Sequence, residues 1–132
     1  MIDDAKRRAI EADCARLIAL YANLVDRADW AGAAALYADD GVLIRPTAPD
    51  EPISGRAAIL AAFLARPARI TRHFCTNVVV DVDSATEARS ECAMLLFNGP
   101  GLPLVGSFHD RFVQTPEGWR FAERRGSIVV AG

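Results

Sequence analysis

The fold is decided by residues 71–97, which read TRHFCTNVVVDVDSATEARSECAMLLF. Apolar and β-branched residues are frequent in this stretch, and Asp83-Ser84 has the composition of a turn between two strands. Turn residues recur at 99–101 and 116–118, and another strand-like run follows each of them. The pattern predicts an antiparallel meander of four long strands: residues 71–82, 86–97, 104–115 and 119–130.

The part of the chain before these strands has the periodicity of helices. Residues 3–28 predict one amphipathic helix, and its apolar stripe consists of Ile10, Cys14, Leu17, Ile18, Tyr21 and Val25. A second helix is predicted over residues 30–38 and a third over residues 55–65, with Asp29 and Ser54 as their caps.

The connections complete the expected architecture. Asp39-Asp40-Gly41 should end the second helix, residues 42–44 form a short strand, and the proline-rich residues 46–54 form a loop. Helices followed by a strand meander predict an α+β fold, because a parallel α/β fold would need helices between the strands. A length of 132 residues fits a single domain over residues 1–132.

Composition and charge exclude several classes of protein. Hydrophobic residues make up 52% of the chain, which is too high for a disordered protein. No apolar run approaches the roughly 20 residues of a membrane-spanning helix. The start of the sequence, residues 1–4, is acidic where a secretory signal would be basic, which predicts a cytoplasmic protein. The net charge is -2 and the arginines are interleaved with acids, so nucleic acid is not an expected partner. The two histidines, His73 and His109, are far apart in sequence and give no support for a metal site.

Four segments, in order over nearly the whole chain, carry a family pattern. They are YANLVDRADWAGAAALYADDGVL at residues 21–43, SGRAAI at 54–59, TRHFCTNVVVDVD at 71–83 and DRFVQTPEGWRFAERR at 110–125. Together they resemble the SnoaL-like family of the nuclear transport factor 2-like superfamily. The resemblance implies a cone-shaped, cystatin-like fold in which three N-terminal helices pack on a curved, mostly antiparallel sheet. It also implies a homodimer formed through the outer face of the sheet.

The superfamily includes scytalone dehydratase, ketosteroid isomerase, limonene epoxide hydrolase, polyketide cyclases and the small subunits of ring-hydroxylating dioxygenases. The fold does not choose among these functions. The resemblance implies a pocket for a small hydrophobic cyclic carbonyl compound, and a cofactor-independent lyase or isomerase that dehydrates, isomerises or cyclises it. A non-catalytic small-molecule-binding module and a structural small subunit of the dioxygenase type are the alternatives.

Two residues are the candidate catalytic pair. Asp26 resembles the aspartate of the first helix in the dehydratase branch, and His73 resembles the histidine at the start of its first long strand. A carboxylate can fix the orientation of an imidazole, which then gives or takes a proton near neutral pH. The alternatives are a surface ion pair of Asp26 with Arg27 or Arg72, and a structural role for His73.

Strand alternation complicates the role of His73. In a regular strand His73 shares a face with Asn77, whereas Val78, Val80 and Val82 take the opposite, more apolar face. Either a bulge reverses this alternation near residues 74–77, or His73 lines the mouth of the cone. If neither holds, His73 points away from the pocket. Asn77 is the candidate donor to a substrate oxygen.

Aromatic residues are candidates for the pocket wall. Tyr21, Trp30 and Tyr37 could line the pocket, although their spacing also suits core packing. Phe108 is a candidate substrate contact on the third long strand, and Asp110 on the same face is expected to form a structural ion pair with Arg124 or Arg125.

Overall fold

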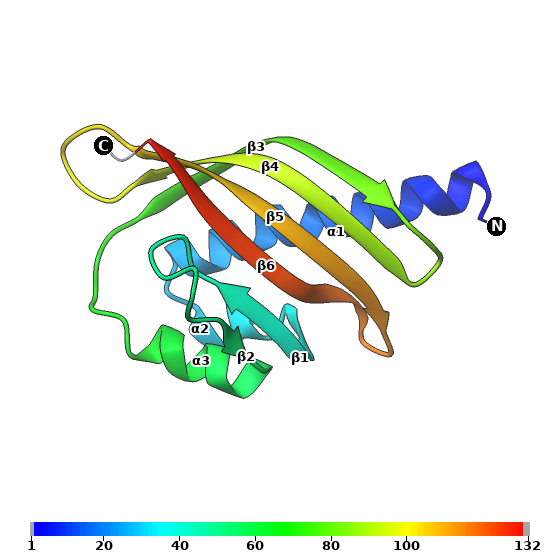
Figure 1. Ribbon diagram of the computed structural model, residues 1–132, viewed down its shortest axis with the longest axis horizontal. Helices are drawn as coiled ribbons and strands as arrows, with labels where there is room; N and C mark the ends of the chain where they lie inside the picture. The colour runs from blue at the N-terminus through cyan, green and yellow to red at the C-terminus, as the bar shows by residue number, and fades with distance from the viewer. Residues whose placement is uncertain (1, 131–132) are drawn as a thin grey trace.

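The computed structural model describes residues 2–130, which form a curved sheet with helices on one side (Figure 1). The elements in chain order are α1 (Asp4–Asp26), α2 (Trp30–Ala34), β1 (Tyr37–Ile44), β2 (Ile53–Ser54), α3 (Arg56–Leu64), β3 (Arg72–Val82), β4 (Glu87–Phe97), β5 (Leu104–Thr115) and β6 (Gly118–Val130). Among the described residues, no helix is long and apolar enough to span a membrane.

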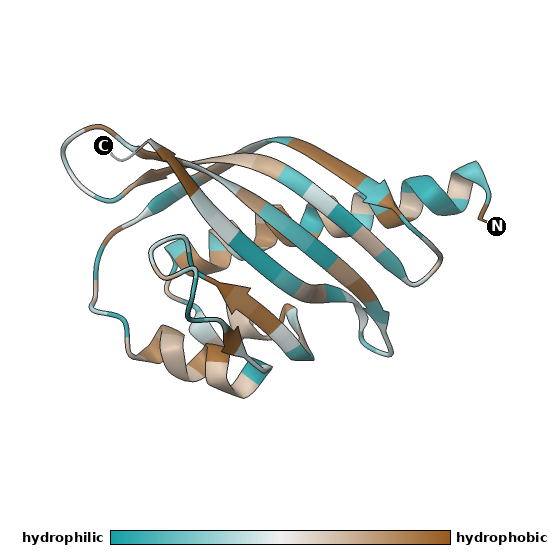
Figure 2. Ribbon diagram, viewed as in Figure 1, coloured by the Kyte–Doolittle hydropathy of each residue, from teal (hydrophilic) through white to brown (hydrophobic). Residues whose placement is uncertain are grey.

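The sheet has six strands in the order β2-β1-β6-β5-β4-β3. The four long strands pair as consecutive antiparallel neighbours, which confirms the predicted meander and the α+β class. β1 pairs with β6 in parallel and with β2 in an antiparallel sense, and neither pairing was predicted from the sequence. In Figure 2 the long strands change between hydrophilic and hydrophobic residues along their length, as expected where one face of a sheet is buried.

α1 crosses the concave side of the sheet and packs on β3 (Figure 1). Its first turn is capped by Asp3, whose carboxylate accepts a hydrogen bond from the backbone N–H of Lys6 at 2.8 Å. The predicted apolar stripe is confirmed, because every one of its residues is buried. The helix ends at Asp26, so this side chain projects where α1 meets the start of β3.

The second helix is shorter than predicted, because α2 ends at Ala34 and β1 begins at Tyr37. The backbone N–H of Phe121 donates to the carbonyl of Leu36 at 2.8 Å, so pairing with β6 replaces further helical turns. Gly41 was expected to end the second helix, but it lies inside β1. A Cβ at Gly41 would lie 2.9 Å from the Phe121 carbonyl oxygen, so this close approach requires glycine.

The third helix is also capped differently from the prediction. Ser54 belongs to the short strand β2, and Gly55 occupies the N-cap position with a φ of 97° and no side-chain hydrogen bond. The loop predicted over residues 46–54 is therefore two residues too long.

A bulge in β3 reverses the direction of its side chains. The pairing of β3 with β4 shifts between Thr76 and Val79, and Asn77 has a φ of 55°. Before the bulge His73 and Cys75 are half-buried, and after it Val78 and Val80 are half-buried. His73 therefore faces the same side of the sheet as Val78 and Val80. Of the explanations offered for the position of His73 in the strand alternation, the structure has the bulge.

Candidate active site

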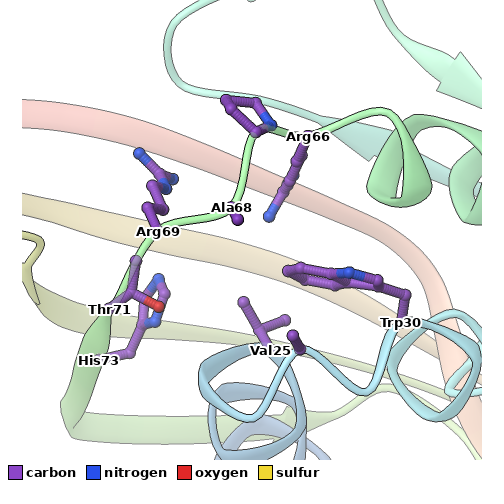
Figure 3. A pocket seen from close by; sticks show the side chains of 9 residues that line it. Val25, Trp30, Arg66, Ala68, Arg69, Thr71 and His73 are labelled. Atoms are coloured by element: carbon purple, nitrogen blue, oxygen red, sulfur yellow. The ribbon is translucent and has the colours of Figure 1, made fainter.

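A cavity of about 420 Å³ lies on the concave side of the sheet. It lies between α1, the end of β1 and strands β4 and β5, and it is lined by apolar side chains that include Val25, Leu43, Met94 and Leu96. A volume of this order suits a small organic molecule. An adjoining hollow of about 180 Å³ shares Val25 and His73 with the larger cavity (Figure 3).

His73 and Asp26 meet at this cavity. The Nδ1 atom of His73 lies 2.6 Å from Oδ1 of Asp26, and the two side chains are only 14% and 7% exposed. The His73 ring lines both the larger cavity and the adjoining hollow, beside Thr71 and opposite Val25 and Trp30 (Figure 3). The expected hydrogen-bonded pair is therefore present, and its imidazole borders the cavity.

The contact with Asp26 fixes the proton positions on the ring. A carboxylate only accepts hydrogen bonds, so Nδ1 of His73 must donate. In the neutral imidazole the other nitrogen, Nε2, then carries a lone pair. Among residues 2–130, no hydrogen bond involves Nε2, so this atom is available to a bound molecule.

Asp26 also ties α1 to β3. Its carboxylate accepts hydrogen bonds from the hydroxyl of Thr71 at 2.9 Å and from the backbone N–H of His73 at 2.8 Å. Three donors therefore converge on one carboxylate, which satisfies the charge in a poorly exposed position. The alternative of a surface ion pair with Arg27 or Arg72 is wrong, because neither arginine contacts Asp26.

The aromatic candidates lie in different places. Tyr21 and Phe108 line the larger cavity, and Trp30 lines the adjoining hollow, where its ring lies 5.6 Å from that of Phe63. Tyr37 is fully buried and lines neither, so its predicted place in the pocket wall is corrected to the core. The prediction that Asn77 donates to a substrate oxygen is also corrected, because the bulge leaves Asn77 exposed and it lines neither the cavity nor the adjoining hollow.

The two tyrosine hydroxyls form a hydrogen bond of 3.0 Å. Burial raises the pKa of both Tyr21 and Tyr37, so both phenols remain protonated at neutral pH. Tyr37 has no exposed surface, and within the described chain its hydroxyl bonds to Tyr21 alone. When Tyr37 donates to Tyr21, the Tyr21 proton remains available to a molecule in the cavity.

Asp110 and Arg124 form an ion pair behind the cavity, with Nε to Oδ1 at 3.0 Å and side chains at most 1% exposed. Burial raises the pKa of Asp110, and Arg124 limits that rise. Burial alone would lower the pKa of Arg124, but Asp110 holds it above its usual value. The guanidinium lies 3.7 Å from the ring centroid of Phe108 and 4.6 Å from that of Tyr21. The structural ion pair predicted for Asp110 is therefore present.

The family model described as a SnoaL-like domain matches residues 6–125. The chain belongs to the SnoaL-like family. No curated protein sequence is significantly similar to it.

Solved structures share the fold of this SnoaL-like domain. A proposed scytalone dehydratase from Novosphingobium aromaticivorans is similar with a TM-score of 0.85 and 21% identity, over 97% of this chain and 89% of the other. A nuclear transport factor 2-like protein with a cystatin-like fold from the same organism has a TM-score of 0.83 and 26% identity, with 97% and 88% covered. A type 2 hexachlorocyclohexane dehydrochlorinase has a TM-score of 0.84 and 18% identity, with 98% and 95% covered. These likenesses confirm the cone-shaped, cystatin-like fold expected of the family.

Sequence reasoning missed three arginines of this SnoaL-like domain. Arg45 follows β1, whereas Arg66 and Arg69 lie between α3 and β3, and all three line the larger cavity. Arg66 extends towards Trp30 (Figure 3), with its guanidinium 5.6 Å from that ring and 4.7 Å from the ring of Phe63. No periodic pattern marks these residues, because they lie outside regular elements.

The tyrosine pair predicts asymmetric effects on stability. Replacing Tyr21 with phenylalanine leaves the sealed Tyr37 hydroxyl without a partner, so the free energy of unfolding should fall by about 1–3 kcal/mol. Replacing Tyr37 should cost less, because the Tyr21 hydroxyl borders the cavity and can bind water. Urea unfolding of both single variants and of the double phenylalanine variant measures this coupling. A double variant whose loss equals the sum of the two single losses would contradict it.

Proposed function

We propose that this SnoaL-like protein catalyses proton transfer on a small hydrophobic cyclic carbonyl compound, and so dehydrates, isomerises or cyclises it. The observation that carries the proposal is the His73 ring at the cavity wall, with Nδ1 held 2.6 Å from the Asp26 carboxylate. The proposed reaction needs no covalent nucleophile, metal site or phosphate-binding motif.

The chemistry begins with His73 as the base. Nε2 removes a proton from the carbon next to the substrate carbonyl, and the C–H electron pair moves to form an enolate. Asp26 stabilises the imidazolium that forms, because its carboxylate lies against Nδ1. The Tyr21 hydroxyl donates a hydrogen bond to the oxygen on which the negative charge develops.

The imidazolium then returns the proton. In a dehydration, the enolate expels a hydroxyl group from the neighbouring carbon, and the proton from Nε2 leaves with that hydroxyl as water. In an isomerisation, the same proton is delivered to a different carbon of the enolate. A general acid–base residue of this type contributes about 10²–10⁴-fold to the rate.

One observation favours a non-catalytic binding module as the second candidate. Asp26 accepts hydrogen bonds from Thr71 and from the His73 backbone, and these bonds would serve equally to join α1 to β3. In a binding module, the pair would be structural, and the same cavity would hold the ligand without turnover.

Deuterium exchange separates the two candidates. The protein is mixed in D₂O with a panel of cyclic and aromatic ketones and their β-hydroxy derivatives, and ¹H NMR follows the protons next to the carbonyl. The proposal predicts exchange, water loss or double-bond migration faster than in buffer. Saturable binding with no exchange in any member of the panel would contradict catalysis and support the binding module.

A further inference from the structure

The mouth of the cavity carries an excess of positive charge. Arg45, Arg66 and Arg69 line the larger cavity, and Arg66 and Arg69 also line the adjoining hollow. No aspartate or glutamate of the described chain lines either space. The whole chain has a net charge of -2, so this concentration of cations is a local feature.

The three arginines have no acidic partner within residues 2–130. Acidic side chains on the outside of the fold pair with other arginines, namely Arg56, Arg89, Arg111 and Arg125. Asp26, beside the cavity, is already occupied by Thr71 and His73. The Nε atom of Arg45 is buried without a hydrogen-bond partner. A buried N–H of a guanidinium that has no partner is costly, and a bound anion would satisfy it.

Arg66 is held in place for such an anion. Its guanidinium packs against the rings of Trp30 and Phe63, which limits its freedom to turn into solvent. Burial lowers the pKa of Arg66, and the positive charges of Arg69 and Arg45 lower it further. The three cations therefore repel one another across the mouth, and an anion between them would relieve the repulsion.

We propose that the ligand of this cavity is a hydrophobic compound that carries a carboxylate, which Arg45, Arg66 and Arg69 bind at the mouth while the apolar part lies against the cavity wall. A guanidinium matches a carboxylate with two parallel hydrogen bonds. His73 borders the same space as these arginines, so the carboxylate would orient the remainder of the ligand along the imidazole. The reacting role of His73 rests on the proposed function, whereas carboxylate binding does not.

Matched ligand pairs test the inference. The dissociation constants of 4-oxocyclohexanecarboxylate, 2-naphthoate and phenylacetate are measured by NMR titration against those of their primary amides at low salt. At least one of the carboxylates should bind at least about tenfold more tightly than its amide. A tenfold difference in the dissociation constant is about what one charge-assisted hydrogen bond of ordinary strength contributes. The preference should weaken as salt is added.

Variants locate the preference. Arg45→Gln and Arg69→Gln should each reduce it several-fold, whereas Arg72→Gln removes the same charge from an exposed position one residue from His73 and should leave it unchanged. The absence of a carboxylate preference in all three pairs, or an equal loss in Arg72→Gln, would overturn the inference. Carboxylate binding without proton exchange would contradict the proposed function alone, and equal turnover of neutral and anionic ketones would overturn this inference alone.

Discussion

Replacing His73 with asparagine is expected to lower the rate of proton exchange by about 10²–10⁴-fold, the contribution of one acid–base residue. Asparagine can still donate a hydrogen bond to Asp26, so the junction of α1 and β3 should remain intact. It has no basic nitrogen, so it cannot take up the substrate proton. The dissociation constant of the same ketone should change little, because the apolar wall of the cavity is untouched.

The chain offers a matched control for this experiment. His109 is the other histidine, and it is exposed on β5 and lines neither of the spaces at the candidate site. His109→Asn should retain the parent rate. A His73→Asn variant that exchanges substrate protons at the parent rate would rule out His73 as the base, whereas loss of ligand binding in that variant would indicate a structural role.

Replacing Asp110 with asparagine is expected to lower the free energy of unfolding by about 3–5 kcal/mol, the usual cost of leaving one member of a buried ion pair alone. The Arg124 guanidinium would keep its charge among the rings of Tyr21, Phe108 and Phe121 with no carboxylate to balance it. For a chain of this length, the melting temperature should fall by roughly 10–18 °C.

Two controls identify the cause of that loss. Asp110→Leu combined with Arg124→Met removes both charges, and it should recover much of the stability. Asp81→Asn breaks an exposed ion pair with Arg89, whose side chain is 59% exposed, and should cost at most about 1 kcal/mol. Thermal and urea unfolding measure all four proteins. An Asp110→Asn variant within about 1 kcal/mol of the parent would show that the pair is not essential.

Regular elements are the part of this fold that the sequence predicts well. The four long strands begin and end within one residue of their predicted bounds, because apolar alternation and turn residues are local signals. The stripe of α1 is equally local. Family resemblance then places Asp26 and His73, and the structure brings their side chains together.

Long-range pairings are the part that the sequence does not predict. α2 ends early because its following residues pair with β6, which lies more than 80 residues later in the chain. The side of the sheet that Asn77 occupies is set by the bulge at its own position, where φ is positive, and sequence alternation cannot locate such a bulge. The three arginines at the cavity mouth come from two separate connections, so only the folded chain reveals their proximity.

The protonation of the His73 ring tests the central claim most directly. With two histidines in the chain, two-bond ¹H–¹⁵N correlation spectra resolve both rings, and the exposed His109 serves as the internal reference. We predict a neutral His73 ring at the pH of fastest exchange, with the proton on Nδ1 and a bare Nε2 whose signal shifts when a ketone binds. A ring with the proton on Nε2 and a bare Nδ1, or an Nε2 signal unchanged by a bound ketone, would contradict the role of His73 as the base held by Asp26.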